Sequence, residues 1–414
     1  MTATRDASTS PSLTPAGGRA SARWRGLDAF RGLAIIGMLL VNAPGNHDAV
    51  YSQIEHSKWN GCTIADLVFP SFLFVVGITT AISLNALRNR DDAVIRARIW
   101  RRAAILFGVG LLLNWFPFYQ SGDVSWTGHD GVLRRIVARL LLLRIPGVMQ
   151  RIAVAYLPAA LVTRRASSRT VAAVVAVLLV GYWLLLTVVP VPGEGVRGAV
   201  VLDQPARTIV AHVDRALFDW TRWGLGNHLW DSALTWDPEG ALSTLPAITT
   251  VLLGVLCARW TLGDPDGRIR KLIIAGAIAI VVGWCWGLVF PLNKSLWTSS
   301  YVLFTAGIAA VVLGVLSVLV DRYATARWAK PLIVFGENPL IAYAGSEVTR
   351  RILHSSIKIR MPTGRMGLDE WVTLQLTHLG LSDKAASLAW SLLFIAAWWL
   401  VLDRLSRRRL FVSA

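Results

Sequence analysis

Apolar residues in this chain gather in long windows that are separated by polar and basic segments. A helix needs about 20 predominantly apolar residues to cross the hydrocarbon core of a bilayer. The windows that approach this length are 27–43, 63–87, 103–118, 147–163, 171–190, 240–258, 272–291, 296–320, 331–347 and 386–403. The pattern therefore predicts an all-α fold, a polytopic integral membrane helix bundle with about ten transmembrane helices.

One run between two of these windows has a different pattern. In "LRRIVARLLLLRI" (133–145) arginines recur at helical spacing among leucines. Such a segment suits a helix that lies along the membrane interface, and it also suits the end of a neighbouring span. The sequence leaves these two alternatives open. The longest connections, 119–146, 191–239 and 348–385, are too short for a separate soluble domain.

Basic residues indicate how the bundle is oriented. Lys and Arg are denser in the connections on the N-terminal side of the membrane, for example in "RNRDDAVIRARIWRR" (88–102) and "RLSRRRL" (404–410). By the positive-inside rule, both termini are predicted to be cytoplasmic. The formal net charge of +17 then follows from topology. The predicted partner of the protein is the lipid bilayer. A nucleic-acid partner is not needed to explain the positive charge.

The windows divide the chain into a membrane domain and two tails. Residues 1–26 are rich in Ser, Thr, Ala, Pro and Arg and are predicted to form a disordered cytoplasmic tail. They contain no apolar stretch typical of a signal peptide, so the first span is expected to act as the targeting signal. The transmembrane domain is predicted at 27–404, and 405–414 is predicted to be a basic cytoplasmic tail.

The three cysteines, Cys62, Cys257 and Cys285, lack the spacing of metal ligands. Cys257 and Cys285 fall inside apolar windows and are expected to be small core residues. No metal, haem or iron–sulfur cluster is predicted.

Ionisable residues inside membrane spans are costly and therefore informative. Among the ionisable residues in the windows are Asp28, Arg31, Asp66, Arg151 and Glu337. Asp28 and Arg31 are three residues apart on one helix face, so a local ion pair is one explanation for both.

A polar run stands at the outer mouth of the second window. The segment "IEHSKWNGCTIADLVFP" (54–70) brings a histidine, amides and a carboxylate close to Asn42, at the end of the first window. A neutral imidazole backed by a carboxylate is the usual arrangement of a general base, and His56 and Asp66 supply both groups. The "TIAD" spacing (63–66) is also that of a capping box, which would give Asp66 a purely structural role.

The polar and ionisable residues lie within longer motifs, which are "LDAFRGLAIIGMLLVNAPGN", "HSKWNGCTIADLVFPSFLFVVGIT", "RIPGVMQRIAVAYL", "DPEGALSTLPAITTVLLG", "FPLNKSLWTSSYVLFTAG" and "FGENPLIAYA". These motifs resemble the heparan-α-glucosaminide N-acetyltransferase family of the transmembrane acyltransferase superfamily. The resemblance covers nearly the whole chain from about residue 23. The lysosomal member has a lumenal domain and a further span, so this chain is expected to be the membrane-only form of the bacterial inner (cytoplasmic) membrane.

The resemblance implies transfer of an acetyl group from cytosolic acetyl-CoA to the amine of a glucosamine-type sugar or glycan. His56 matches the family's active-site histidine and Asn42 its partner asparagine, while Asp66 is expected to orient His56 or cap the second helix. In one route His56 accepts a proton as the amine attacks, and Asn42 donates to the developing oxyanion. In the other route His56 first carries the acetyl group itself. The sequence does not choose between them.

Other polar residues of these motifs are assigned to the two substrates. The residues predicted to contact acetyl-CoA are Asp28, Arg31, Gln150, Arg151, Glu337 and Asn338. The residues predicted to contact the acceptor are Trp59, Asn60, Glu239, Ser243, Lys294 and Trp297. For all of them, helix capping, interhelical hydrogen bonds or anchoring at the membrane interface are the alternatives.

Two classes of function remain at this point. The first is a polytopic acetyltransferase. The second is a transporter or permease for a sugar or an acyl group without acetyl-transfer chemistry, which the composition alone favours. Long motifs in matching order favour the enzyme. The identity of the acceptor, N- or O-acetylation, and assembly into a homodimer are left open.

Overall fold

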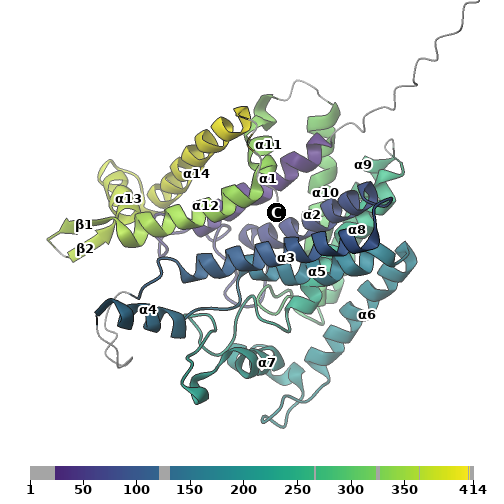
Figure 1. The fold of residues 1–414 in the computed structure, drawn as a ribbon, viewed down its shortest axis with the longest axis horizontal. Helices are drawn as coiled ribbons and strands as arrows, with labels where there is room; N and C mark the ends of the chain where they lie inside the picture. Colours follow the sequence, from purple (N-terminus) through teal and green to yellow (C-terminus); the bar gives the residue numbers. More distant parts are fainter. Residues whose placement is uncertain are drawn as a thin grey trace, which may run out of the picture.

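The computed structural model describes residues 24–120, 131–264, 267–322, 327–362, 364–408 and 410. Within these ranges the regular secondary structure is almost entirely helical, as the hydrophobic pattern predicts. Long helices form one bundle, and the short elements α4, α7, α13 and the β1–β2 hairpin lie at its lower and left margin in the view of Figure 1. Most of the predicted tail 1–26 lies outside the described residues, but Arg25 already begins the first helix.

The α-helices follow in chain order. They are α1 (Arg25–Asn42), α2 (Ile64–Ala86), α3 (Asp92–Trp115), α4 (Gly131–Leu141), α5 (Val148–Arg165), α6 (Ser168–Thr187), α7 (Ile209–Phe218), α8 (Thr244–Leu262), α9 (Arg268–Gly287), α10 (Ser299–Ser317), α11 (Lys330–Glu337), α12 (Pro339–Arg351), α13 (Leu368–His378) and α14 (Asp383–Arg407). The strands β1 (Lys358–Met361) and β2 (Gly364–Gly367) pair antiparallel, with Lys358 opposite Gly367. Single turns of 3₁₀ or π-helix are η2 (Gly198–Val201), η3 (Pro205–Arg207), η4 (Thr221–Trp223), η5 (Val318–Arg322), η6 (Arg327–Ala329) and η7 (Ile352–Ser356).

Several helices have the length and apolar character needed to cross a bilayer. Among the described residues there are six of them: α2, α6, α8, α9, α10 with its extension to Asp321, and α14. The chain is therefore an integral membrane protein. The helices α1, α3 and α5 also coincide with predicted windows, but each carries charged residues near one end, such as Arg31 in α1 and Arg151 in α5.

The predicted span 331–347 is wrong as a single helix. The structure divides it into α11, which ends at Glu337, and α12, which begins at Pro339. Proline has no backbone N–H and disfavours helical geometry at the preceding residue, so a helix tends to end before it. Asn338, between the two helices, is fully buried. Breaks of this kind inside membrane proteins are tolerated where the irregular backbone is covered by protein or lines a cavity.

The structure also decides between the alternatives for 133–145. Most of this run forms α4, a separate helix of 11 residues in which Ala138 is the buried residue. A helix of that length extends only about 16 Å, too short to cross the hydrocarbon core. In Figure 1, α4 lies beside the long helices and is not part of a span.

The prediction that Cys285 is a core residue is wrong. Cys285 is exposed on α9, whereas Cys257 on α8 is half-buried. Helix α9 is peripheral, because only 17% of its apolar window is buried inside the protein. An apolar window therefore does not distinguish a residue that faces lipid from one that faces the core.

Hydrogen bonds group the connections on two sides of the bundle. Asn60, after α1, donates to Asp203 at 2.6 Å and accepts from Asn293 at 3.1 Å, so the connections after α1, α6 and α9 meet. At the opposite helix ends, Arg165, the last residue of α5, donates to Asp92, the first residue of α3, at 3.0 Å. Consecutive long helices therefore run in alternating directions.

Close packing of α1 against α11 depends on two glycines. A Cβ atom added to Gly32 would lie 1.7 Å from the carbonyl oxygen of Leu332, and one added to Gly336 would lie 2.0 Å from that of Asp28. No larger residue fits this contact, and such approaches by small residues are typical of membrane helices. The contact holds the charged start of α1 beside the break between α11 and α12.

Candidate functional site

The two oxygens of the Asp66 carboxylate serve different partners. Oδ1 accepts a hydrogen bond from Nδ1 of His56 at 2.9 Å. Oδ2 accepts from the backbone N–H groups of Ser57 at 3.1 Å and Thr63 at 3.0 Å, and from the Thr63 hydroxyl. The capping box and the histidine pair, which the sequence presents as alternatives, are thus present together. The Asp66 side chain is 0% exposed and the His56 side chain 43% exposed, so the carboxylate orients a ring that remains accessible.

Pro70 explains how Asp66 is joined to the neighbouring helix α10. Proline at this position of α2 has no N–H to donate to the carbonyl oxygen of Asp66, four residues earlier. The buried hydroxyl of Tyr301 on α10 donates to that carbonyl instead. The "DLVFP" element therefore leaves one acceptor free inside the bundle, and α10 satisfies it.

Lys294 lies against the His56 ring. Its Nζ is 3.1 Å from Nδ1 and 3.0 Å from Nε2, and 3.8 Å from Oδ1 of Asp66. Because Nδ1–H donates to Asp66, the lone pair of the ring is on Nε2, where Lys294 donates. Burial lowers the pKa of Lys294, although Glu239 and Asp66 act in the opposite direction.

A short connection between α9 and α10 holds Lys294 in place. Asn293 Oδ1 accepts from the backbone N–H of Leu296 at 2.8 Å, and the Thr298 hydroxyl donates to the carbonyl of Pro291 at 2.8 Å. Trp297 in this turn has a φ of +52°, which is unusual for a residue other than glycine. Its indole N–H donates to the Thr250 hydroxyl at 3.1 Å, and it is 1% exposed. Trp297 therefore supports the turn from inside the bundle.

Arg144 binds two carboxylates beside this turn. Its Nε donates to Oδ2 of Asp237 at 2.8 Å, its Nη2 to Oδ1 of Asp237 at 2.6 Å, and Nη2 also donates to Glu239. Burial alone would lower the pKa of Arg144, but the two carboxylates hold it above its usual value. Burial also acts on Glu239, yet Arg144, Arg151 and Lys294 keep the pKa of Glu239 below its usual value. Glu239 is thus an ionised acid close to Lys294.

Arg151 is a buried cation at the start of α5. It donates through Nη2 to the Ser243 hydroxyl and to the carbonyl of Gly240, and its guanidinium lies 5.0 Å from the centre of the Trp297 ring. In the part of the chain that the structure describes, Nε and Nη1 of Arg151 have no hydrogen-bond partner. Buried donors without a partner are costly, so these atoms point to an acceptor that the described residues do not supply.

Asn42 has a partner that the sequence analysis missed. Its Nδ2 donates to Oε1 of Glu347 on α12 at 3.2 Å, and Oε2 of Glu347 accepts from Arg350 at 3.0 Å. Asn42 and Glu347 line a narrow cleft between α1 and α12 together with Met38 and Tyr343. Glu347 is the last residue of the window 331–347, so a sequence signal for it existed.

A cavity of about 180 Å³ continues from this cleft toward the other ends of the helices. Met38 and Tyr343 line both spaces, and Arg31, Arg102 and Glu337 line the far end of the cavity. The wall between these ends is mostly apolar. The cavity therefore follows α1 from its basic end to Met38, beyond which only the narrow cleft leads to Asn42.

The residues predicted to contact acetyl-CoA fall into two groups. Arg31 lies at the end of α1 that contacts α11, where it donates to the carbonyl of Gly336 at 2.9 Å and pairs with Asp28 at 3.6 Å. Glu337 accepts from the Ser406 hydroxyl nearby at 2.7 Å. Gln150 and Arg151, in contrast, stand at the first turn of α5, at the His56 end of the bundle. The structure therefore does not bring all six predicted residues together.

Trp59 and Asn60 join loops to one another. The Trp59 indole N–H donates to the carbonyl of Leu202 at 3.0 Å, and its ring meets Trp236 edge to face at 5.3 Å. Asn60 joins Asp203 and Asn293, as described above. Both residues close the loop that carries His56, and Trp59 remains partly exposed beside it.

The buried Asp214 carboxyl is expected to make the stability of this region depend on pH. Its carboxylate accepts backbone hydrogen bonds from Asp237 at 3.2 Å and Ala241 at 2.9 Å, but burial raises its pKa to about 7. The folded protein therefore holds this proton more tightly than the unfolded chain, whose carboxyl has a pKa of about 3.9. The resulting stabilisation is complete below the unfolded pKa and is lost as the pH rises to about 7.

We expect the melting temperature of the wild type, relative to that of Asp214→Asn, to fall between pH 5 and pH 7 and then to level off. Asp231→Asn, at an exposed site of the same loop, is the control and should follow the wild type at every pH. A constant difference between wild type and Asp214→Asn across this range would contradict the assignment.

Comparison with known proteins bears on what this site does. Residues 23–193 match a family model described as "Heparan-alpha-glucosaminide N-acetyltransferase, catalytic". That range includes Asn42, His56 and Asp66. The chain is also 29% identical, over 391 residues, to human heparan-alpha-glucosaminide N-acetyltransferase. The chain is therefore similar to this family in the region that holds Asn42, His56 and Asp66.

Similarity to the family continues beyond the matched range. The alignment to the human protein covers 81% of this chain and 55% of that protein. The mouse heparan-alpha-glucosaminide N-acetyltransferase is 29% identical over 377 residues, which are 79% of this chain and 53% of the mouse protein. The chain thus spans about half the length of the curated relatives it matches.

Proposed function

We propose that this protein is a membrane acetyltransferase that moves an acetyl group from acetyl-CoA to the amine of a glucosamine-type sugar. The observation that carries the proposal is the His56–Asp66 pair, a partly exposed imidazole oriented by a buried carboxylate, within the part of the chain that matches the family's catalytic model. This arrangement suits a base or nucleophile at the membrane surface.

The proposed topology has ten passes with both termini in the cytoplasm. The passes are α1, α2, α3, α5, α6, α8, α9, α10, the pair α11–α12, and α14. The connections after α1, α6 and α9 meet on one side of the bundle, and the start of α3 meets the end of α5 on the other side, which supports this topology. The arginines at the start of α3 and the end of α5 support it as well, because basic residues favour the cytoplasmic side. His56 and Lys294 would then lie at the outer face. The proposed location is the inner (cytoplasmic) membrane of a bacterium.

The proposed route of the donor is the space along α1. Acetyl-CoA would approach from the cytoplasm, with its phosphates near Arg31 and Arg102 and its acyl arm in the cavity that leads to Asn42. The volume of about 180 Å³ is below the range typical of small-molecule pockets, so it suits the slim arm and not the nucleotide. The Asn42 amide, held by Glu347, would donate to the thioester oxygen.

Lys294 has a proposed role in acceptor binding. It occupies the Nε2 lone pair that the attacking amine must use. An incoming amino sugar would displace Lys294 toward Glu239, whose charge already attracts it. Arg151, with two donor atoms free among the described residues, would receive a sugar or acyl oxygen next to Ser243. Trp59, Asn60 and Trp297 would shape this pocket from its loops.

Release of CoA-SH by the purified protein tests the proposal. Acetyl-CoA and glucosamine are supplied together, and free thiol and N-acetylglucosamine are measured in detergent, where transport has no meaning. Matched formation of both products supports the acetyltransferase. No thiol release with any amino sugar or glycan, combined with sugar uptake by proteoliposomes, would instead favour the transporter. Assembly into a homodimer stays a prediction, which the mass of the same purified sample tests.

A further inference from the structure

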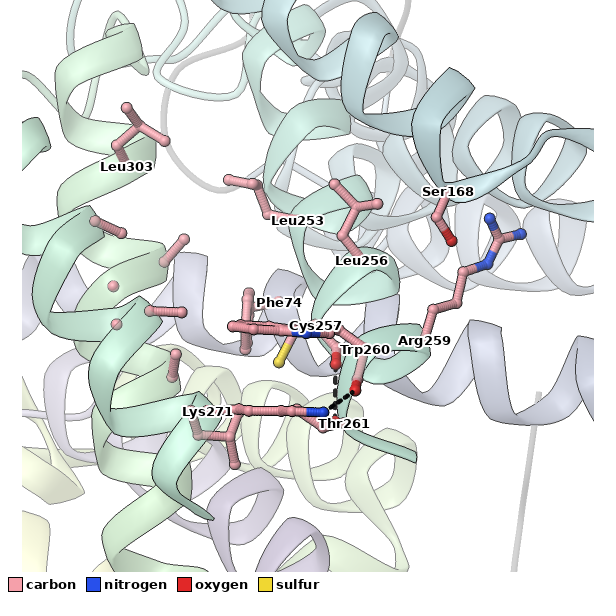
Figure 2. A pocket seen from close by; sticks show the side chains of 17 residues that line it. Phe74, Ser168, Leu253, Leu256, Cys257, Arg259, Trp260, Thr261, Lys271 and Leu303 are labelled. Carbon is pink, nitrogen blue, oxygen red and sulfur yellow. Dashed lines mark hydrogen bonds between the residues drawn. The ribbon is translucent and has the colours of Figure 1, made fainter. Parts of the chain in front are cut away.

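A groove on the lipid-facing side of the bundle has no part in the proposed acetyl transfer. It is a cavity of about 520 Å³ between α6, α8, α9 and α10, seen from close by in Figure 2. Its wall is nearly all apolar and includes Phe74, Leu253, Leu256, Leu272 and Leu303. Helices α6 and α9 are the peripheral members of this group, with 28% and 17% of their windows buried. The groove is therefore open toward the bilayer.

The groove has the depth of one membrane leaflet. Along α8 its lining runs from Leu253 to Thr261, and eight steps of helix span about 12 Å. Half of the hydrocarbon core is about 15 Å thick. On α9 the side chains that face it, Ala275 and Ala279, are small and leave the space open. One extended acyl chain fits a slot of this shape.

The groove ends at a group of cations. Ser168 at the start of α6, Arg259 near the end of α8 and Lys271 near the start of α9 line this end. Figure 2 shows Arg259 next to Ser168, and Lys271 apart from them. Lys271 pairs with Asp264 at 3.0 Å, so its charge is compensated. Arg259 donates to the carbonyls of Thr163 and Ala166, and no ion pair with a carboxylate involves it among the described residues. Among the described residues, no carboxylate therefore compensates its positive charge.

A second cavity adjoins the same arginine. It has a volume of about 670 Å³ and is lined by Arg88, Arg90, Arg164 and Arg259, with Asp92 as the acid. Asp92 already pairs with arginines of α3 and α5. Arg259 lines both the apolar groove and this basic cavity. The guanidinium of Arg259 thus lies where the apolar groove and the basic cavity adjoin.

We propose that this composite site binds one anionic phospholipid. Its phosphate lies at Arg259, its headgroup extends into the basic cavity, and one acyl chain lies in the groove. A hydrocarbon tail alone would distinguish no lipid class, because every bilayer lipid offers one. The excess of arginines at the end of the groove selects for a net negative headgroup. This inference does not depend on the acetyltransferase activity.

Competition between two lipids tests the site. The detergent-purified protein is incubated with equal amounts of dioleoyl phosphatidylglycerol and dioleoyl phosphatidylcholine, freed of unbound lipid, and analysed for retained lipid by mass spectrometry. We expect the wild type to retain the anionic lipid with a preference of about fivefold or more, the effect of one basic residue near a membrane surface. Arg259→Gln should remove this preference. Arg270→Gln, an exposed α9 arginine outside both cavities, should keep it.

A second pair of variants tests the groove independently of Arg259, whose bonds to α5 also have a structural role. Ala279→Trp fills the groove and should lower retention of both lipids, whereas Ala277→Trp, on the exposed face of α9, should not. Each variant is compared only if it elutes as a single species like the wild type. Equal retention of the two lipids by the wild type, or equal retention by the two tryptophan variants, would overturn the proposal.

Discussion

Replacing His56 by alanine is expected to reduce acetyl transfer to glucosamine by roughly 10²- to 10⁴-fold, the range typical for loss of a general base. The side chain lies at the surface and would lose only its Nδ1–H bond to Asp66 and its contact with Lys294, so the fold should persist. His378→Ala, which removes an exposed histidine of α13, is the matched control and should remain fully active. Both rates are measured as thiol release and as N-acetylglucosamine formed.

The kinetics of His56→Ala also separate the two chemical routes. If His56 carries the acetyl group, the wild type should release one equivalent of thiol before any acceptor is added, and the variant should release none. If His56 only accepts a proton, neither protein should show this early phase. Full activity of His56→Ala would contradict both routes and remove the central residue from the proposal.

Asp66→Asn is a more demanding test of the same pair. Asp66 must accept from His56 through one oxygen and from Ser57 and Thr63 through the other. An amide has only one acceptor oxygen, so either the cap or the histidine tautomer is lost.

Asp66 therefore illustrates how far the sequence was informative. The "TIAD" spacing correctly indicated a cap, and the nearby histidine indicated a dyad, because both partners are local.

Contacts between distant residues could not be predicted in the same way. Lys294 and His56 are separated by 238 positions, and Asn42 and Glu347 by 305. The sequence suggested Lys294 only through its motif, and it gave no reason to pair it with the histidine. Hydrophobic windows predicted the bundle well because crossing a bilayer sets the length of a helix. They did not reveal which helix faces lipid, as the exposed Cys285 shows.

One failure had a visible local cause, and a second did not. Pro339 in "FGENPLIAYA" was available to divide the window 331–347, but the overall apolar character outweighed it. Arg144 in "RIPG" was not singled out because a charged residue in a loop is usually solvated. Its importance comes from burial between Asp237 and Glu239, about 90 positions later, as the separations of 93 and 95 residues show. The burial of Arg144 depends on the fold, so no local sequence pattern indicates it.

Arg144→Met should have the largest effect on stability. It leaves the Asp237 carboxylate, which is 0% exposed, and the Glu239 carboxylate, which is 10% exposed, without their main partner. Removal of one partner from a buried ion pair typically costs about 3–5 kcal/mol. We expect a marked fall in the melting temperature of the detergent-purified protein. By contrast, Arg207→Ala, which breaks an exposed pair with Glu194 in a neighbouring loop, should change it little.

A rescue variant separates lost charge compensation from lost packing. In Arg144→Met combined with Asp237→Asn and Glu239→Gln, no unpaired charge remains, so most of the stability should return. Activity should not return with it. Glu239 helps to hold Lys294, and the triple variant lacks that charge beside the His56 ring. If the triple variant is as unstable as Arg144→Met, packing and not charge is the cause. If it is stable and fully active, Glu239 has no part in acceptor binding, and Lys294 is placed by its own turn alone.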